Sequence, residues 1–481
     1  MSVSSISTSA TTPPSLPLDS EPLQSPERQQ QPISDVLASE KGTDKSNRLE
    51  HVPTQFVGKG EADTQRSPPF SSPRHKKTPS SRLNGAPKEQ KAPGLLVEDI
   101  CDKDGERLTS LAWDDKPKPH RTQTELVSGR RAGASWDRSH IHFAPISVPL
   151  KRRLQTLMVL SHTLSIALFL TAFFLLCAIP LFWPLLFPYT IYVLLSAAPH
   201  SGTLAHRSPF LRSLPIWSLF ASYFPARLHR SARLEPTRKY IFGYHPHGII
   251  SHGAFATFAT EACGFSTLFP GITNTLLTLD SNFRVPFYRD YALAMGLASV
   301  SRESCENILS KGGPNGEGMG RAITIVIGGA RESLDAQPRS DLRLVLKRRK
   351  GFVKLGIRTG ADLVPVLAFG ENELYEQVTS DSHPFVHQVQ LMVKKCMGFT
   401  VPLFHARGVF NYDVGLMPYR RPLNVVVGRP VKVVQARKGE KVDEAYVDEI
   451  HAAYVTELER IWEEWREVFG VEKGVELRIV E

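Results

Sequence analysis

The stretch KYIFGYHPHG, residues 239–248, decides the fold, because an apolar run of strand length ends at once in two histidines around a proline. Three later stretches repeat the apolar run, namely AITIVIGGA at 322–330, ADLVPVLAF at 361–369 and LNVVVGRPV at 423–431. Continuous Ile, Val and Leu runs are typical of strands that are covered on both faces. Residues 239–481 are therefore predicted to form an α/β domain with a mixed or mainly parallel sheet flanked by helices.

An uncharged apolar run precedes this domain, from Leu154 to Ala198. It is about twice the ~20 residues that one helical span requires. Because Pro180, Pro184 and Pro188 lie near its middle, we expect a transmembrane helical hairpin over residues 147–200, with a buried core hairpin as the alternative. Basic residues flank both ends, namely Lys151, Arg152 and Arg153 before the run and Arg207 and Arg212 after it. The positive-inside bias then places both termini in the cytosol.

The remaining segments differ sharply in composition. Residues 1–146 are rich in Ser, Pro, Gln, Lys and Arg, and they are predicted to be a disordered cytosolic region, with a short apolar island at 94–100 that is able to make a transient contact. In residues 201–238, aromatic side chains alternate with Arg and His. This segment is predicted to lie in the headgroup layer or to pack on the domain, and both can hold. Residues 444–470 carry apolar side chains at helical spacing, which predicts a long amphipathic helix.

Composition excludes several classes of protein. The formal net charge of +10 favours an anionic membrane surface, because no finger, helix-turn-helix or RNA-binding pattern accompanies it, so no nucleic-acid partner is expected. The five cysteines show no CxxC spacing, which argues against a zinc module or a disulfide framework and favours a reducing environment. The first residues lack the basic and apolar regions of a cleavable signal peptide.

Candidate chemical groups follow the ends of the predicted strands, where ligands bind in open α/β sheets. His245 and His247 end the first strand, Glu332 follows the glycines of the second, and Glu371 follows the third. An imidazole backed by a carboxylate makes a general base near neutral pH, because the ordinary pKa of histidine is ~6.5. Gly248 allows a substrate to approach the main chain, and its N–H is able to bind an oxyanion.

Two other roles for the histidine pair stay open. Residues i and i+2 of an extended segment share one face, which suits metal ligation as well as acid–base chemistry, and a structural core histidine is the third possibility. No GxSxG motif is present and no cysteine stands beside a histidine, so no covalent nucleophile is evident. The glycine cluster at 311–320 precedes a strand and lacks a following GK[ST], which indicates a loop rather than a phosphate cradle.

Five motifs in order carry a resemblance to a known family. They are YFP at 223–225, HPHG at 245–248, VIGGARESLDA at 326–336, RKGFVKLGIRTGADLVPVLAFGENELY at 349–375 and VVVGRP at 425–430. Together they resemble the diacylglycerol acyltransferase 2 family from roughly Ile216 to the C-terminus. The resemblance implies an acyl-CoA:diacylglycerol O-acyltransferase that makes triacylglycerol as a multi-pass protein of the endoplasmic reticulum membrane and on lipid droplets. It implies acyl-CoA as co-substrate and neither a cofactor nor a metal.

The chemistry that esterification needs assigns roles to individual residues of these motifs. The base is His247, and His245, Gly248 and the main chain of Gly328 and Gly329 are the candidate oxyanion donors. Related glycerolipid acyltransferases have an acid five positions after the histidine, but His252 stands there, so Glu332 is expected to orient the imidazole. Candidate ligands for the CoA phosphates are Arg331, Lys350, Lys354 and Arg358, with RKGF (Arg349, Gly351 and Phe352 included) as the first choice, and a solvated basic face is the favoured alternative for any single one of them. Further expected substrate-binding residues are Tyr223, Phe224, Pro225 and Glu371.

Other functions remain compatible with the sequence. A monoacylglycerol or a wax alcohol is the alternative acceptor to diacylglycerol. A homo-oligomer is compatible with the sequence. A membrane-bound metal-dependent lipid hydrolase would use His245 and His247 as metal ligands, and its activity would be lost to a chelator. A non-catalytic lipid-droplet coat protein would use the apolar hairpin alone and would need neither histidine.

Overall fold

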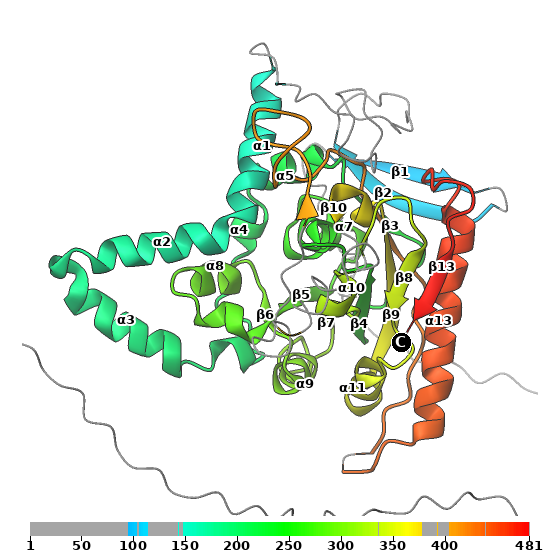
Figure 1. Cartoon of the computed structure of the whole chain (residues 1–481). Coiled ribbons are helices and arrows are strands. Elements are labelled where there is room, and N and C mark those ends of the chain that lie inside the picture. The colour runs from blue at the N-terminus through cyan, green and yellow to red at the C-terminus, as the bar shows by residue number, and fades with distance from the viewer. Residues whose placement is uncertain are drawn as a thin grey trace, which may run out of the picture. The chain divides into compact units, whose positions relative to one another are not determined.

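The computed structural model describes residues 95–102, 105–113, 143, 148–334, 336–377, 392, 404–437 and 439–480. Residues 1–94 and 114–142, for which the sequence predicts disorder, lie outside this part. At its centre is a nine-stranded sheet with the strand order β1-β2-β3-β12-β9-β4-β7-β5-β6 (Figure 1). The strands are β1 Leu95–Cys101, β2 Arg107–Trp113, β3 Arg227–Arg230, β4 Lys239–His245, β5 Thr273–Thr278, β6 Ala298–Ser299, β7 Arg321–Val326, β9 Ala361–Phe369 and β12 Asn424–Val427.

The sheet is mixed, with a parallel centre. Neighbouring strands run parallel from β9 through β4, β7 and β5 to β6, whereas β12 is antiparallel to β9. All four strands predicted from apolar runs are present, and β4 and β9 begin and end where those runs do. The prediction of a mixed α/β fold with a sheet flanked by helices is confirmed. Two small pairs lie outside the sheet, β10 Glu376–Gln377 with β11 Phe404–His405 and β8 Leu342–Val345 with β13 Leu477–Val480.

Helices cover both faces of the sheet, and β4 alternates between them. Phe242 and Tyr244 point into one buried cluster, and Ile241 points into the other. The first cluster is covered by α5 Ile216–Tyr223, α6 His252–Ala254, the π-helix Phe255–Ala259, α7 Phe265–Leu268 and α8 Tyr288–Ala294. The second is covered by α9 Arg302–Ser310, α11 Gly351–Thr359 and α13 Glu444–Trp465. The predicted C-terminal helix is thus α13, and Asp443 caps its first turn by accepting the N–H of Ala445.

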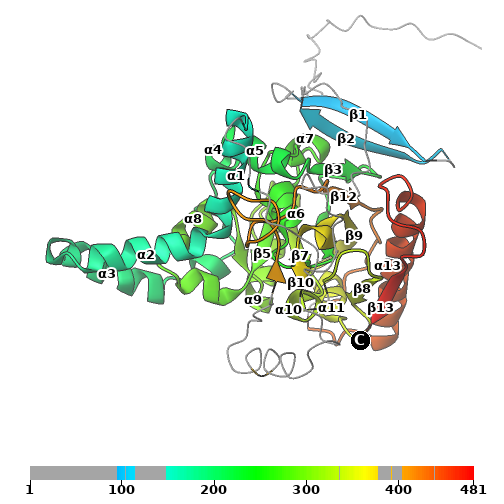
Figure 2. The same cartoon turned by 45° about the horizontal axis from the view of Figure 1, so that its top comes forward.

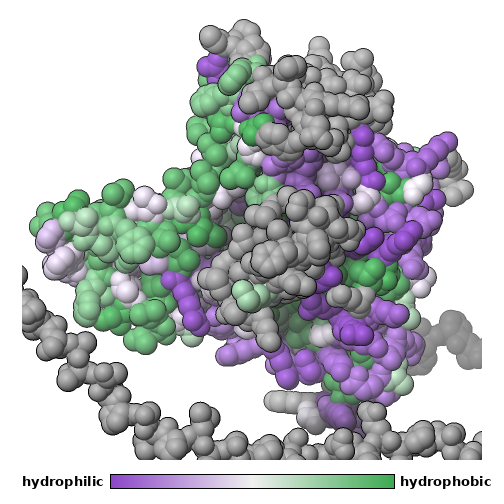
Figure 3. Space-filling view, viewed as in Figure 1, coloured by the Kyte–Doolittle hydropathy of each residue, from purple (hydrophilic) through white to green (hydrophobic). Residues whose placement is uncertain are grey.

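The apolar run forms three helices, α1 Leu150–Thr163, α2 Ser165–Cys177 and α3 Trp183–Leu195. The chain turns between α2 and α3 at the short helix Pro180–Phe182, and the other two prolines lie within α3. No residue of α2 is buried, and hydrophobic side chains gather over α2 and α3 (Figure 3). In the described residues, one helical stretch, Pro180–His200, is by itself long and apolar enough to cross a membrane.

The first helix of the run behaves differently. A bend of 68° at Leu164 separates α1 from α2, and the two reach the length and apolarity of a membrane span only together. Arg420 donates hydrogen bonds to Gln155 Oε1 at 2.7 Å and to Thr156 Oγ1 at 3.1 Å, which fasten α1 to the domain. The projecting apolar unit is therefore α2 with α3, and the transmembrane hairpin over residues 147–200 stays a prediction.

The segment predicted to be interfacial is largely part of the domain. Trp217, Phe220 and Tyr223 of α5 are buried in the first cluster, and the segment then continues into β3. The short helix α4 Pro209–Arg212 also ends in a buried residue, because Arg212 donates to the carbonyl oxygens of Met295 and Phe258. Trp217, Phe220 and Tyr223 thus follow the second interpretation, packing on the domain, whereas Phe210 of the same segment is exposed.

A β-hairpin stands where the sequence predicts disorder. β1 pairs with β2, and β2 extends the sheet by pairing with β3. Leu108 and Leu111 of β2 are buried, and Arg227 forms an ion pair with Glu98 of β1. The prediction of disorder is wrong for residues 95–101 and 107–113, because the average composition of a long polar region hides two short strands that bury apolar side chains against a sheet edge.

This hairpin divides truncations into two classes. Removal of residues 1–94 should leave the thermal unfolding temperature and the specific activity of the membrane-bound protein nearly unchanged. Removal of residues 1–146 should lower the unfolding temperature, because the burial of Leu108 and Leu111 contributes about 1.5–3 kcal/mol each and the edge of β3 loses its partner. Equal unfolding temperatures for the two truncated proteins would contradict this role of the hairpin.

Candidate active site

His245 ends β4 with its ring turned toward α13. Its Nε2 lies 3.0 Å from the hydroxyl of Tyr454, which itself donates to the carbonyl of Gly243 at 3.1 Å. Because the Tyr454 hydroxyl donates its only proton to Gly243, it accepts the hydrogen bond from His245 Nε2–H. Burial lowers the pKa of His245 to about 3, which makes the ring neutral. Its place in the second core cluster is that of a structural histidine.

His247 lies half-buried beyond the cis bond between His245 and Pro246, and its ring is held by the next residue. Its Nδ1 lies 3.0 Å from the carbonyl oxygen of Gly248. A carbonyl oxygen only accepts, so Nδ1 carries the proton and Nε2 keeps its lone pair. Burial lowers the pKa of His247, which favours this neutral form at physiological pH. The ring therefore has the tautomer that a general base requires at Nε2.

Glu332 lies beside His247, but it binds main-chain groups. Its carboxylate accepts the N–H of His247 through Oε1 and the N–H of Val345, at 3.0 Å, through Oε2. The ring of His247 instead makes its hydrogen bond, among the described residues, to Gly248. The two residues that the sequence-based expectation paired lie side by side, but a carbonyl oxygen sets the tautomer of His247 and Glu332 holds the backbone of the turn. Gly328 is required next to it, because a Cβ there would lie 2.0 Å from Glu332 Oε2.

Glu371 supports the turn from the other side. It is buried, and its Oε2 accepts the hydroxyl of Tyr244 at 2.9 Å and the N–H of Gly253 at 3.0 Å. Gly248 has a φ of +58°, and a Cβ on it would lie 2.7 Å from Glu371 Cγ. Only glycine fits this position without strain. Burial raises the pKa of Glu371 to about 7.

The YFP motif packs against a third histidine. Phe224 stacks on the ring of His252, with centroids 5.1 Å apart, and His252 Nε2 lies 2.8 Å from the hydroxyl of Tyr375. Tyr223 donates to the carbonyl of Pro418 at 2.6 Å. Tyr223 and Phe224 are buried, whereas Pro225 is exposed. Sequence reasoning did not place His252 and Tyr375 in the site, although His252 follows His247 at the spacing where related enzymes have an acid.

The basic residues of α11 are tied to neighbouring helices. Lys350 pairs with Asp448 at 2.5 Å, Lys354 pairs with Glu444 at 2.6 Å, and Arg358 contacts Glu306 of α9 at 3.2 Å. In the RKGF motif, Arg349 and Gly351 are exposed, whereas Phe352 is buried against Tyr454. Arg331, in the helix α10 Gly329–Glu332, is half-buried and has polar contacts of its own. These ion pairs weaken the expectation that α11 holds the CoA phosphates.

The two histidines of HPHG do not form a pair on one face. His245 points to α13, and the ring of His247 is held against the main chain of the turn. Within the described residues, no three His, Cys, Asp or Glu side chains lie close enough to hold a metal ion. The arrangement suits acid–base chemistry at a single imidazole better than metal ligation.

Comparison with known proteins gives consistent matches. Residues 173–480 match the family model described as diacylglycerol acyltransferase. The chain is 53% identical over 289 residues to diacylglycerol O-acyltransferase 2A of Umbelopsis ramanniana. The aligned residues cover 60% of this chain and 79% of the relative. It is 46% identical over 288 residues to diacylglycerol O-acyltransferase 1 of Schizosaccharomyces pombe, with 59% and 81% covered. It is 44% identical over 293 residues to 2-acylglycerol O-acyltransferase 1 of Bos taurus, with 60% and 85% covered. No solved structure matches the chain.

Glu371 should make the stability of the protein depend on pH. Its pKa of about 7 lies above the ordinary value of 4.5, so its contribution to stability is fully present below pH 4.5 and is lost as the pH rises through 7. Glu371→Gln should flatten the unfolding temperature between these pH values, measured on purified protein in detergent. Glu449→Gln, at an exposed position of α13, is the matched control and should leave the slope unchanged. A slope in Glu371→Gln equal to that of the unaltered protein would contradict this assignment.

Proposed function

Since the chain belongs to the diacylglycerol acyltransferase family, we propose that this acyltransferase esterifies the free hydroxyl of diacylglycerol with the acyl group of acyl-CoA. The observation that carries the proposal is the tautomer of His247, which leaves Nε2 as a base at the carboxyl edge of the sheet. The names of the relatives from Umbelopsis ramanniana and Schizosaccharomyces pombe support diacylglycerol as the acceptor.

The reaction needs one proton carrier. His247 Nε2 takes the proton of the acceptor hydroxyl while the hydroxyl oxygen attacks the thioester carbonyl carbon. The tetrahedral intermediate then collapses, the carbon–sulfur bond breaks, and the imidazolium returns the proton to the leaving CoA thiolate. A positioned base of this kind contributes about 10²–10⁴ in rate, and the remainder comes from orientation and from donors to the oxyanion.

Gly248 is the main-chain donor that suits the oxyanion. Its N–H makes no hydrogen bond to any residue of the described part, and it adjoins the base. His245 is less suited, because its Nε2–H already donates to Tyr454 inside the second core cluster. We therefore assign His245 to the support of the turn and Gly248 to the reacting oxygen.

A monoacylglycerol is the second candidate acceptor. The relative from Bos taurus is named 2-acylglycerol O-acyltransferase, and it is nearly as similar to the chain as the relative from Schizosaccharomyces pombe. A panel of diacylglycerol, 2-monoacylglycerol and a long-chain alcohol, offered with labelled acyl-CoA and separated by lipid class, distinguishes these acceptors. Triacylglycerol as the main product supports the proposal, and a main product from either other acceptor contradicts it.

The hairpin of α2 and α3 is proposed to insert into the endoplasmic reticulum membrane and the lipid-droplet surface. With 13 residues, α2 is ~20 Å long, which is less than the ~30 Å of a bilayer core. Such a hairpin enters and leaves from one side, which agrees with the basic flanks. It is held to the domain by Tyr189, which donates to Asp290 at 2.6 Å and accepts the N–H of Phe287 at 2.6 Å.

The base is tested by substitution. His247→Ala should lower kcat at least ~100-fold while acyl-CoA still binds, because the binding energy is spread over the CoA and acyl contacts. His206→Ala, at an exposed histidine, is the control and should retain normal kcat. The two values come from the rate of triacylglycerol formation at saturating substrates. A kcat for His247→Ala within a few-fold of normal would exclude it as the base.

Topology is tested by protease access. In sealed microsomes, protease added outside should cleave a tag at the N-terminus and a tag at the C-terminus to the same extent. Epitope blots with and without detergent give the protected fraction for each tag. Protection of one tag but not the other would rule out a hairpin that returns to the cytosolic side.

A further inference from the structure

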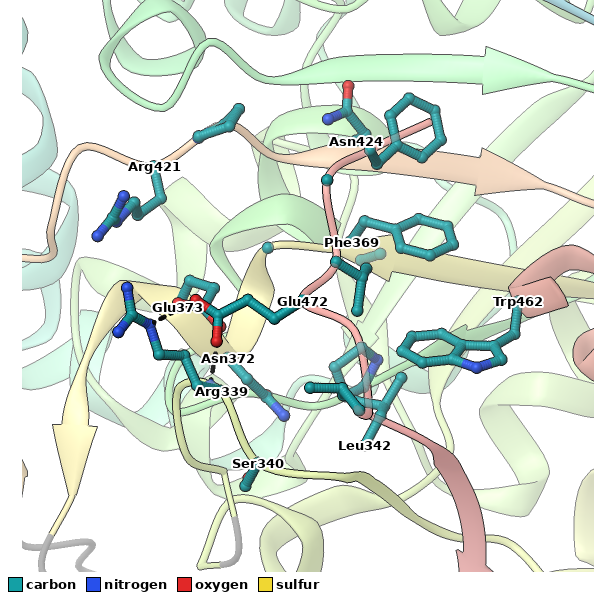
Figure 4. A pocket seen from close by; sticks show the side chains of 18 of the residues that line it. Arg339, Ser340, Leu342, Phe369, Asn372, Glu373, Arg421, Asn424, Trp462 and Glu472 are labelled. Carbon is teal, nitrogen blue, oxygen red and sulfur yellow. Dashed lines mark hydrogen bonds and ion pairs between the residues drawn. The ribbon is translucent and has the colours of Figure 1, made fainter. Parts of the chain in front are cut away.

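A cavity of about 210 Å³ lies at the carboxyl edge of the sheet (Figure 4), and His247 is not among the residues that line it. The end of β9, the start of β12 and the segment 468–475 that follows α13 form its walls. Pro246 also lines it, so the cavity adjoins the HPHG turn on the side that faces α13.

Polar groups without partners converge on this cavity. Arg421 is only 7% exposed, and neither its Nε nor its Nη2 has an acceptor among the described residues. Asn372 Oδ1 and Trp462 Nε1, which line the same cavity, also lack a partner within that part of the chain. A buried donor or acceptor without a partner is costly, so these groups indicate a polar ligand.

Arg421 lies among charges of both signs, because Glu373, Glu472 and Arg339 all act on its guanidinium. The second arginine of the cavity, Arg339, is already paired through its Nε with Glu472 at 3.1 Å. Its main-chain N–H donates to Glu373 Oε1 at 3.0 Å, and burial raises the pKa of Glu373. The guanidinium of Arg421 is thus the cation with N–H groups to offer.

Aromatic rings form the opposite wall. The rings of Phe369 and Trp462 stack, with their centroids 5.9 Å apart and an angle of 8° between the ring planes. The ring centroid of Phe469 lies 5.1 Å from that of Phe369. Figure 4 shows the rings of Phe369 and Trp462 on one side and the side chains of Arg339, Arg421 and Glu373 on the other. A flat apolar wall opposite an arginine suits a heteroaromatic base that carries phosphate.

The cavity lies on the side of the domain away from the apolar hairpin. In Figures 1 and 2, α13 stands at the opposite side of the sheet from α2 and α3. The surface near α13 is largely hydrophilic in Figure 3. A water-soluble ligand therefore fits this place better than a lipid does.

We propose that this cavity binds the phosphorylated adenosine end of acyl-CoA, with Arg421 as a phosphate ligand and the Phe369–Trp462 wall against the base. The proposal rests on the proposed function, since it assumes acyl-CoA as donor. The thioester end then reaches His247 around Pro246, and the acyl chain continues toward the membrane side.

The test compares two acyl donors. With acyl-CoA, Arg421→Gln should raise KM about tenfold and leave kcat nearly unchanged, because it removes binding that is equal in ground and transition states. With S-acyl-pantetheine, which lacks the nucleotide, Arg421→Gln and the unaltered protein should have the same kcat/KM. Arg302→Gln, at an exposed arginine of α9, is the control and should change neither donor.

Further variants keep the proposal testable if Arg421→Gln folds poorly. Glu373→Gln removes a carboxylate beside the two arginines and should lower KM for acyl-CoA, whereas a higher KM would contradict the proposal. Adenosine 3′,5′-bisphosphate should compete with acyl-CoA at least tenfold better than adenosine does, and Arg421→Lys should reduce this preference only in part.

An unchanged KM in Arg421→Gln, or an equal loss of kcat/KM with both acyl donors, would overturn the site. An unaltered protein that uses no acyl-CoA would instead refute the proposed function.

Discussion

The hydrogen bond from the main-chain N–H of His247 to the buried carboxylate of Glu332 holds the turn on which the candidate site depends. A buried N–H needs an acceptor, and a charged acceptor contributes about 1.5–3 kcal/mol. Glu332 follows β7 and Glu371 follows β9, the two neighbours of β4 in the sheet. The position of the imidazole is thus set by three adjacent strand ends. Residues far apart in the chain are needed to aim one ring.

Much of this arrangement could be predicted from the sequence. Continuous apolar runs located β4 and β9, and the rule that ligands gather at carboxyl strand ends brought His247, Glu332 and Glu371 together. The sequence could not predict that Glu332 binds the main-chain N–H of His247 and not its ring. Motif spacing gives the order of residues along the chain, but it does not give the direction of the chain after Pro246. The same limit applied to His245, whose ring turns into the second core cluster although HxH spacing on an extended strand would place it beside His247.

Two other features escaped prediction for different reasons. The hairpin of β1 and β2 contains a few apolar residues in a long polar region, so composition alone does not reveal it. The bend at Leu164 has no proline or glycine to mark it, and it arises where α1 is held by Arg420 while α2 leaves the domain. Tertiary contacts decide both features, and local sequence carries little signal of them.

The apolar surface and the hydrophilic surface of the domain lie on different sides. Hydrophobic side chains lie on α2 and α3, and the hydrophilic surface lies near α13 (Figure 3). The HPHG turn follows β4 at the carboxyl edge of the sheet, and under the proposed function an acceptor from the membrane and a donor from water meet there at the imidazole of His247.

The dependence of kcat/KM on pH tests most directly whether a carbonyl oxygen or a carboxylate holds the ring of His247. A base must be unprotonated, so the rate rises with pH through its pKa. Burial lowers the pKa of His247 and outweighs the hydrogen bond to the Gly248 carbonyl, which raises it, so this rise should have an apparent pKa below 6.5, followed by a plateau at higher pH. A carboxylate paired with the ring would stabilise imidazolium and move the rise above 6.5. A rise above 6.5 would therefore contradict the assignment of the Gly248 carbonyl as the partner of the His247 ring.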